Sequence, residues 1–596
     1  MPGGLHNPPL SGFIVATTLV VAASDSLDVD RADYECDGTA DDVQIQAAHD
    51  ALPAGGGKIV LLEGTYNLAA AIVITKVIEL AGNGWNTILF LTNNTNTNLI
   101  EIGDGATGLN GVIIKDLAMD GNRANNAAGT TRGIEMIGAA APNKVTRVMI
   151  DHVFVTSTHD YGICGIGAPG DGDYSVITNC EVTDCNDSGI RFLGTGIQVI
   201  GNYVHDISAG DGILVGADCS VISNYIHTIP GNGITMGNYC VAIGNYVEAA
   251  TASGINPTNN AVIDGNVIWN TAGEGIDGGS TNIVSNNWIY ITGDDGIRMS
   301  ANCVITDNYI FNAGEEGIYI QGADTLIADN EIRGASQEAA NNHNGITLSG
   351  AADRCTITDN LILDDGTKTE DGIRLEDGAT QCQINSNRCY NLRGSGIALV
   401  ANNDDCQIVG NYCQLNDDYG IEITAATCDR TYVKNNKLIA NVTAQFLDSG
   451  TNTQLATYVV PFSDGTDPQD SGYEIDANTE MARAWLRLPP EVQQVVRMNV
   501  YARSVVTEAD EMELQMVVLG GADNEAYNTH DGSIAQLDSV SANFAADDIV
   551  FWRNTEAGVL ALVGGDSVEV KVLHEAAEGG NCETDAFFRT VEIEYV

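Results

Sequence analysis

The sequence predicts an all-β chain in which a parallel β-helix, or solenoid, follows a capping helix and precedes an antiparallel β-sandwich. Two repeated phrases support this prediction. The dipeptide Gly-Ile recurs through the middle of the chain, at steps of 21 residues from Gly212 to Gly317. A second phrase, Val-Ile-x-Asn-x-Val or a close variant, recurs at the same pace. Each repeat is too short to bury an apolar face alone, so we expect stacked coils of short strands.

The charge of the chain limits its partners. It has 596 residues, with 80 Asp and Glu against 26 Lys and Arg, and a formal net charge of −54. Such a field repels nucleic acid and anionic membranes, and it repels polyanionic sugars unless a cation such as Ca²⁺ bridges them. No apolar run is long enough to cross a membrane. We therefore expect neither nucleic-acid binding nor membrane insertion, and Ca²⁺ is the one cofactor that the composition suggests.

Residues 1–29 are predicted to be an attachment arm. The apolar run 13–24 resembles the core of a secretory signal, but no Lys or Arg precedes it, so a strand is favoured. Next, Asp-Gly-Thr-Ala-Asp-Asp leads into an amphipathic stretch at residues 42–52, which predicts a turn and a helix N-terminus. A helix there would cover the open end of the solenoid core and its strand edges.

Residues 30–445 are predicted to form the solenoid. Alternation within each short run places apolar side chains inside and polar side chains outside. The Gly of Gly-Ile is expected to serve a turn with positive φ. The Asn of the second phrase would stack from coil to coil as a hydrogen-bonded ladder. It recurs at Asn179, Asn202, Asn224, Asn245, Asn266, Asn287, Asn308, Asn330, Asn360, Asn387, Asn411 and Asn436.

The cysteines follow the same repeat. Of the 14 in the chain, six share one phase and two share another, and there is no Cys-x-x-Cys motif. We interpret most of them as small buried core residues rather than disulfides or metal ligands. The first phase holds Cys219, Cys240, Cys303, Cys355, Cys382 and Cys406, and the second holds Cys389 and Cys413.

Residues 446–596 have a different pattern. The repeat stops after about Lys437, and longer alternating runs follow, such as 481–489, 495–506 and 512–521, separated by polar, Gly-rich turns. This pattern is typical of an antiparallel β-sandwich, here of jelly-roll type.

Residues 30–445 resemble the right-handed parallel β-helix of the pectin-lyase-like superfamily. Residues 32–68 resemble its opening module, as found in phage and secreted pectate-lyase-type proteins: Asp-Gly-Thr-Ala-Asp-Asp leads into a short helix, and Gly-Gly-Gly-Lys-Ile-Val-Leu-Leu-Glu-Gly-Thr-Tyr forms a first strand. The resemblance implies a location outside the cell or on a virion. It is compatible with lyases, hydrolases, epimerases, adhesins and tailspikes.

A candidate site lies in the acidic residues before Gly-Ile. In a solenoid, one phase of every coil lines one stripe, so acids on three successive coils would stack about 4.8 Å apart. Crowded carboxylates can split into a proton donor and an ionised partner, as glycosidases require. The predicted catalytic residues are Asp294, Asp295, Glu274 and Glu316. The predicted substrate-binding residues are Asp277, Arg298, Tyr319, His343 and Arg374, the last two on or beside longer loops.

The segment Gly-Asp-Asp-Gly-Ile (residues 293–297) also resembles the Gly-Asp-Asp-Cys motif of polygalacturonase-type glycosidases, which implies acid and base roles for Asp294 and Asp295. The chain departs from that family one coil later, where Glu315-Glu316-Gly317 stands in place of Gly-His-Gly. The alternative interpretation is structural: acids before Gly are ordinary turn residues, and a stack of them is solvated surface or a Ca²⁺ site.

Three functions are compatible with this pattern. The first is a virion or cell-surface spike that recognises a surface polysaccharide through a β-helix groove and can also degrade it, working as a homo-oligomer such as a trimer or with other virion proteins. The second is a secreted polysaccharide hydrolase or lyase. The third is a structural decoration protein without a ligand.

Overall fold

The computed structural model describes residues 17–138, 143–165, 171–337, 343–364, 367–376 and 378–461, and the backbone of further strands between residues 473 and 595. The chain separates into two units, Met1–Asn341 and Asn342–Val596, and each is described by itself. The coils form a right-handed parallel β-solenoid with little helix.

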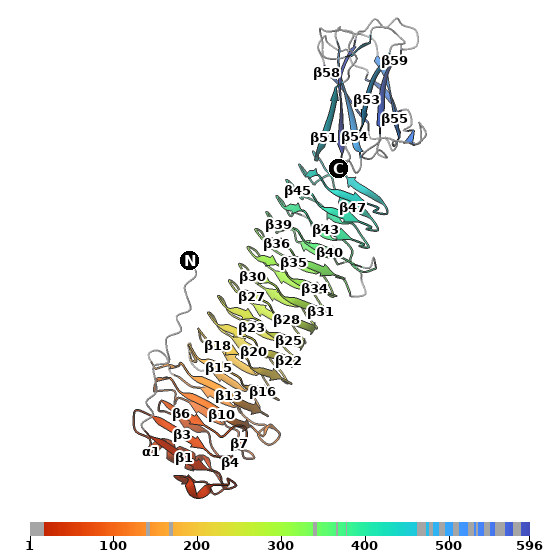
Figure 1. Cartoon of the computed structure of the whole chain (residues 1–596). Coiled ribbons are helices and arrows are strands. Elements are labelled where there is room, and N and C mark those ends of the chain that lie inside the picture. The colour runs from red at the N-terminus through yellow and green to blue at the C-terminus, as the bar shows by residue number, and fades with distance from the viewer. Residues whose placement is uncertain are drawn as a thin grey trace. The chain divides into compact units, whose positions relative to one another are not determined.

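Each regular coil of the first unit contributes three short strands. We call the sheet that begins at Gly-Ile the Gly-Ile face, the sheet that leads to the repeated Asn the pre-Asn face, and the sheet that follows it the post-Asn face. In Figure 1 these strands stack one above another along the first unit, from orange through yellow to green.

The Gly-Ile face of the first unit consists of β5 (Ile72–Ile74), β8 (Ile100–Ile102), β11 (Ile134–Met136), β14 (Ile163–Gly165), β17 (Ile190–Phe192), β20 (Ile213–Val215), β23 (Ile234–Met236), β26 (Ile255–Pro257), β29 (Ile276–Gly278), β32 (Ile297–Met299) and β35 (Ile318–Ile320). The pre-Asn face consists of β15 (Val176–Thr178), β18 (Gln198–Ile200), β21 (Ser220–Ile222), β24 (Val241–Ile243), β27 (Val262–Asp264), β30 (Ile283–Ser285), β33 (Val304–Thr306) and β36 (Leu326–Ala328). The post-Asn face consists of β16 (Glu181–Thr183), β19 (Tyr203–His205), β22 (Tyr225–Ile229), β25 (Tyr246–Ala250), β28 (Val267–Thr271), β31 (Trp288–Thr292), β34 (Tyr309–Phe311) and β37 (Glu331–Arg333).

The earlier coils are less regular. Strands β10 (Ile113–Asp120) and β13 (Met149–Thr156) run through both Asn faces, since β13 pairs with β15 and with β16. Before them lie β3 (Gly57–Leu61), β4 (Gly64–Leu68), β6 (Ile78–Ala81) and β7 (Thr87–Leu91), with the short strands β2 (Tyr34–Glu35), β9 (Leu109–Asn110) and β12 (Val145–Thr146) and the 3-10 helices Val29–Arg31 and Arg123–Asn125.

Stacked Ile residues form the core. On the Gly-Ile face, Ile213 pairs with Ile234 and Ile234 with Ile255, and all three side chains are fully buried. The middle residue of each such strand is partly exposed, so it points outward. The alternation predicted from the sequence is therefore present, and it places one outward residue per coil on this face.

The Asn ladder is confirmed. Asn266 donates its side-chain amide to Asn287 Oδ1 at 2.9 Å and to the Ala242 carbonyl at 2.9 Å, and its own Oδ1 accepts from Asn245. The same bonds recur from Asn202 to Asn330 in the first unit and from Asn360 to Asn436 in the second. Asn179 is an exception, because Cys180 occupies the ladder position and donates its N–H to Asn202 Oδ1.

The prediction that the repeated Gly serves a turn with positive φ was wrong. The Gly-Ile glycines do not have positive φ; an added Cβ at Gly275 would instead lie 2.6 Å from the Gly296 carbonyl and 2.5 Å from Ile289 Cγ2. The left-handed residue is the one before each ladder Asn, such as Gly244, Gly265 or Asn286. Gly at Gly-Ile is required by the close approach of the next coil.

At the N-terminal end, the predicted strand is present as β1 (Thr18–Ala22), which pairs in parallel with β3; residues 1–16 lie outside the described residues. The predicted helix is α1 (Asp42–Ala51). Asp41 precedes it but makes no capping bond; its carboxylate accepts the N–H groups of Gly38 and Asn67. That α1 caps the core stays a prediction.

The thirteen cysteines in the described residues are buried, as predicted. Cys582 lies outside the described residues. Cys389 and Cys413 face each other on neighbouring strands, and Cys382 donates its thiol to the Ala352 carbonyl. Among the described residues, no helix is long and apolar enough to span a membrane.

The second unit repeats the three faces. Its Gly-Ile face consists of β38 (Ile346–Leu348), β41 (Ile373–Leu375), β44 (Ile397–Leu399), β47 (Tyr419–Ile423) and β50 (Ala444–Asp448). Its pre-Asn face consists of β39 (Thr356–Thr358), β42 (Gln383–Asn385), β45 (Gln407–Val409) and β48 (Tyr432–Lys434), and its post-Asn face of β40 (Leu361–Leu363), β43 (Arg388–Tyr390), β46 (Tyr412–Gln414) and β49 (Lys437–Ile439).

The end of the chain is antiparallel, as predicted. Strand β60 (Ala586–Tyr595) pairs with β51 (Gln454–Pro461), β52 (Tyr473–Ile475) and β54 (Val495–Ser504), and β54 pairs with β58 (Ile549–Asn554). A second sheet contains β53 (Met481–Arg487), β59 (Ser567–Glu575), β55 (Met512–Gly521), β56 (His530–Asp531) and β57 (Ala535–Val540). The stacking of these two sheets as a sandwich stays a prediction.

Candidate functional site

The outer side of the Gly-Ile face brings most of the predicted site residues together. Strands β29, β32 and β35 place Asp277 opposite Arg298 and Arg298 opposite Tyr319. All three side chains are partly exposed. The turns that precede these strands supply the acids of the Gly-Ile phrase. We call the following set the arginine patch: Glu274, Asp277, Asp295, Arg298, Glu316 and Tyr319.

Arg298 lies at the centre of the arginine patch. Its Nη1 is 3.3 Å from Glu274 Oε1, and its guanidinium lies 5.5 Å from the centre of the Tyr319 ring. Glu274 also accepts a hydrogen bond from Ser253 Oγ, and Asp277 accepts one from Asn256 Nδ2. A planar cation held between a carboxylate and an aromatic face has a fixed orientation.

The residue before Gly-Ile has a structural role that explains part of the repeat. Asp295 Oδ1 accepts the backbone N–H of Glu316 on the next coil at 3.1 Å. Asn232 makes the same bond to Ser253, and Asp371 makes it to Ser395. A short side chain with an acceptor oxygen is therefore favoured at this position in these coils. This finding supports the structural interpretation for Asp295, which is only 1% exposed.

Burial changes the chemistry of Asp295 as well. Removal from water, then the charge of Glu316 and a hydrogen bond with its carboxyl group, raise the pKa of Asp295 to about 8. Two carboxyl groups this close favour one shared proton over two negative charges. Asp295 is thus a carboxylic acid, rather than a carboxylate, near neutral pH.

Asp277 is the second acid with a perturbed environment. Burial and then the charge of Glu274 raise its pKa, and Arg298 opposes the shift. Asp277 is partly exposed, so it can meet a ligand directly, whereas Asp295 is nearly covered. The arginine patch therefore combines a partly exposed acid, a carboxylate paired with Arg298 and an aromatic ring, which together suit hydroxyl-rich ligands.

Asp294 and Glu315 occupy the turn positions one residue earlier. The backbone of Asp294 accepts from Glu315 N–H at 3.2 Å and from Thr292 Oγ1 at 2.8 Å. The first bond connects the turns of neighbouring coils, and the second lies within one turn. The structure therefore places Asp294 beside the arginine patch, at the corner of the coil.

His343 and Arg374 lie in the second unit. The His343 carbonyl accepts from Glu370 N–H, and its side chain is partly exposed. Arg374 Nη1 is 2.7 Å from Asp371 Oδ2. Asp371 is 4% exposed, and burial raises its pKa. Burial also raises the pKa of Glu422, two coils further on the same face. Arg374 thus belongs to an acid–arginine cluster of its own.

A further charged cluster was missed from the sequence. On the same face nearer the N-terminus, Arg132 is 2.8 Å from Asp160 and also pairs with Glu135, and both Arg132 and Arg191 lie over the ring of Tyr161. Its coils are longer than 21 residues, so its members do not share a regular phase in the sequence.

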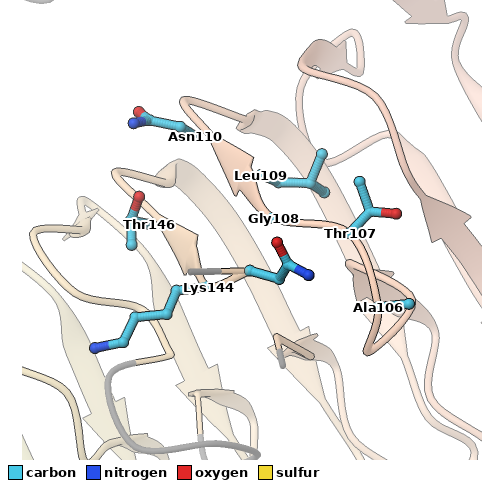
Figure 2. Close-up of a pocket in the computed structure, with 8 residues that line it drawn as sticks. Ala106, Thr107, Gly108, Leu109, Asn110, Lys144 and Thr146 are labelled. Carbon is cyan, nitrogen blue, oxygen red and sulfur yellow. The ribbon is translucent and has the colours of Figure 1, made fainter. Parts of the chain in front are cut away.

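A shallow pocket of about 570 Å³ lies away from the acids, between β9 and β12. Figure 2 shows Thr107, Leu109 and Lys144 around it. Lys144 Nζ is 3.0 Å from Asp173, so its charge is already compensated. The described residues that line this pocket include no carboxylate, so they offer no acid–base pair.

Family models match two overlapping parts of the chain. The model described as right handed beta helix region matches residues 289–458, and the model described as periplasmic copper-binding protein (NosD) matches residues 206–369. The resemblance to right-handed β-helix proteins of the pectin-lyase-like superfamily is thereby confirmed. Among curated proteins, none matches the chain.

Several solved structures resemble the chain. The mannuronan C-5 epimerase AlgE4 A-module of Azotobacter vinelandii is 18% identical, over 73% of this chain and 100% of that chain, with a TM-score of 0.38. The pre-mature gene product 12 of bacteriophage phi29 is 12% identical, over 82% and 79%, with a TM-score of 0.46. The Dettilon tailspike protein is 12% identical, over 92% and 91%, with a TM-score of 0.34. At these values none of them assigns a function to this chain.

Among the described residues in the copper-protein match, the buried cysteines do not form a copper centre. Copper in proteins takes thiolate, thioether or imidazole ligands that converge on one point. Cys219 and Cys240 instead lie in the core, where their thiols donate to the carbonyls of Ala217 and Gly216. In the arginine patch, Glu274 is paired with Arg298. Ca²⁺ binding stays a prediction from the sequence.

Proposed function

We propose that this chain recognises a neutral surface polysaccharide through the arginine patch, as the spike or fibre of a virion or a cell surface. The single observation that supports the proposal is the geometry of Arg298, which is held between Glu274 and the face of Tyr319 on a partly exposed surface. Sugars present hydroxyl groups to carboxylates and guanidinium groups and C–H faces to aromatic rings. The net charge of −54 favours a neutral ligand over a polyanion.

The test is affinity electrophoresis of the full chain in gels that contain dextran, pullulan, galactomannan or xyloglucan, with Arg298→Ala beside the wild type. Loss of charged hydrogen bonds should weaken binding about tenfold. Arg388→Ala is the matched control, because Arg388 also lies over tyrosine rings, at 5.4 and 5.7 Å, but outside the arginine patch. Equal binding by all three proteins would remove the arginine patch from recognition.

Hydrolysis of the bound polysaccharide is the second candidate function. It is favoured by the raised pKa of Asp277, because burial and the charge of Glu274 make this partly exposed carboxyl easier to protonate than an ordinary Asp. In that reaction Asp277 would protonate the leaving glycosidic oxygen while a carboxylate activates water. Elimination by a lyase needs a free base, and the one basic residue of the arginine patch is paired with Glu274.

Release of reducing ends from the same polysaccharides distinguishes binding from hydrolysis. A hydrolase should lose activity in Asp277→Asn while its affinity is kept, because the amide keeps the shape of the side chain. Asp295→Asn tests the alternative donor. Binding without release in the wild type would leave recognition as the function, and new absorbance from unsaturated sugar ends would point to a lyase instead.

A further inference from the structure

A second surface feature lies on the post-Asn face of the first unit. From β19 to β34, the outward positions of successive strands are mostly aromatic, and parallel pairing sets them side by side. The first outward column reads Tyr203, Tyr225, Tyr246, Val267, Trp288 and Tyr309. The second includes His205, His227, Trp269, Tyr290 and Phe311. We call these two columns the aromatic strip; its strands β22, β25, β28, β31 and β34 follow one another in Figure 1.

Neighbouring rings of the aromatic strip stack on one another. The rings of Tyr225 and Tyr246 have centres 4.9 Å apart and planes 19° apart, and those of Tyr290 and Phe311 have centres 4.5 Å apart and planes 20° apart. Rings on adjacent coils are therefore at stacking distance, with their faces turned along the solenoid.

The first column is interrupted at one coil. Val267 pairs with Tyr246 on one side and with Trp288 on the other, so these two aromatic residues are two coils apart, about 9–10 Å between Cα atoms. Val267 is partly exposed. Among the described residues, no ring contact joins Tyr246 to Trp288. Tyr246 stacks on Tyr225, and the Trp288 ring lies tilted against Tyr309, with centres 5.4 Å apart.

We propose that one pyranose ring of a neutral polysaccharide lies over Val267, between Tyr246 and Trp288, with the polymer running along the aromatic strip. A ring at that level is one coil from each aromatic neighbour, the spacing at which Tyr225 and Tyr246 already stack. Trp288 is 59% exposed and Trp269, on the same strand as Val267, is 44% exposed, so large apolar faces are open to a ligand there. This inference rests on the proposed function for its ligand class.

The polar groups of the aromatic strip favour a sugar over an apolar partner. Glu248, in the second column, accepts from Tyr225 Oη at 3.3 Å, and His227 bonds to Tyr203 Oη at 2.7 Å. His205 is 3.3 Å from Glu181. Carboxylate and imidazole groups among the rings can hydrogen-bond to the hydroxyl groups of a sugar. Burying them in a dry interface between two copies of the chain would be costly. Two copies would also repel each other, because each carries a net charge of −54.

The arginine patch and the aromatic strip lie on the same coils. In one coil, Tyr290 on β31 is followed by Asp295 in the turn and by Arg298 on β32. A polymer that follows the aromatic strip therefore passes the coils that carry the arginine patch. The two sites are separable by mutation, because no residue belongs to both.

Val267→Tyr tests the proposal most sharply, with Val267→Ala as its matched control. Tyr stands at the equivalent position in four other coils of this column, at Tyr203, Tyr225, Tyr246 and Tyr309, so the larger residue fits the fold. It should fill the space that the sugar takes and weaken binding of the full chain to the polysaccharide identified in the electrophoresis panel by tenfold or more. Val267→Ala should bind like the wild type. Trp288→Ala should weaken binding by a similar factor. Tyr239 is an exposed aromatic residue in a turn outside the aromatic strip, so Tyr239→Ala should bind like the wild type.

Each outcome decides the matter. Loss in Val267→Tyr and Trp288→Ala with retention in Val267→Ala supports the proposal. Wild-type affinity in Val267→Tyr, while Arg298→Ala is impaired, overturns it and leaves the proposed function intact. No binding of any neutral polysaccharide by the wild type overturns both. Sedimentation showing that Val267→Tyr dissociates a wild-type oligomer, without an effect on polysaccharide binding, would overturn it too and assign the aromatic strip to contacts between copies.

Discussion

At the scale of single residues, one position serves two purposes. The residue before Gly-Ile first needs a side-chain oxygen that accepts the backbone N–H of the next coil. Asp211, Asn232 and Asp295 each provide this oxygen. Charge is tolerated where the side chain is partly exposed, as at Asp211. Asp295 differs because Glu316 stacks next to it and both are crowded, so the ladder bond also creates a proton-holding carboxyl pair.

Asp295→Asn should therefore make the first unit less sensitive to pH. A carboxyl whose folded-state pKa lies near 8, above the ordinary value of 3.8, contributes stability below about pH 4 and loses it progressively as the pH rises to about 8. Asn keeps the ladder acceptor and removes the titration. Urea denaturation between pH 5 and pH 9 should show the free energy of unfolding of the variant rising relative to that of the wild type as the pH rises. The difference should stop growing above about pH 8. Parallel pH profiles would contradict this assignment.

At the scale of the element, each coil is fixed at two corners. One corner holds the buried Asn ladder, preceded by a left-handed residue. The other holds the Gly-Ile turn, where the next coil approaches too closely for a side chain. Between these corners, three-residue strands are long enough, because every backbone group pairs with the coil above or below.

Asn287→Ala should be strongly destabilising. It removes an acceptor for two groups of Asn266 and two bonds donated by Asn287 itself, all buried. We expect a loss of roughly 3 kcal/mol in the free energy of unfolding. The exposed Asn125 donates one amide bond, to Asn122, and does not have positive φ, so Asn125→Ala should cost less than about 1 kcal/mol. Denaturant titration of the two variants measures the difference, and similar losses would argue against the ladder as a source of stability.

Gly275→Ala should destabilise by about 1–3 kcal/mol, because its Cβ would overlap the Gly296 carbonyl and Ile289. Gly55 supplies the control, because no atom lies within 4 Å of a Cβ added there. Gly55→Ala should change the stability by less than about 0.5 kcal/mol. Thermal unfolding of both variants is sufficient. If Gly275→Ala leaves the stability unchanged, the coils can separate slightly without a loss of stability.

The sequence was most informative where the repeat is regular. A step of 21 residues fixes the register, so the repeat alone places Asp277, Arg298 and Tyr319 on one stripe. The Arg132 cluster lies in longer coils, where the phase is lost. The aromatic strip joins residues that are one coil apart in the chain, which the alternation within a single strand does not reveal. The cause of the Gly requirement depends on an approach between coils, which no local pattern reveals.

At the scale of the whole molecule, charge is the dominant property. The chain carries 80 acidic against 26 basic residues, and several basic residues are used in pairs, such as Arg298 with Glu274 and Arg374 with Asp371. Mutual repulsion of the remaining acids opposes the compact state and disfavours polyanionic ligands.

Salt should therefore stabilise the protein. Raising NaCl from about 10 mM to about 0.5 M shortens the Debye length from about 30 Å to a few ångströms and screens this repulsion. We expect the midpoint of thermal unfolding to rise by several degrees. A midpoint that is unchanged or falls with salt would mean that paired charges outweigh the net repulsion.

The central claim, recognition of a neutral polysaccharide by the outer surface of the solenoid, is tested most directly by isothermal titration of the full chain with galactomannan, pullulan, dextran and xyloglucan at low and high salt. Polygalacturonate serves as the anionic comparison. The account predicts saturable binding of at least one neutral polymer with an affinity that salt leaves nearly unchanged, and no binding of polygalacturonate in the absence of Ca²⁺. Binding of polygalacturonate alone, or of none of these polymers, would contradict it.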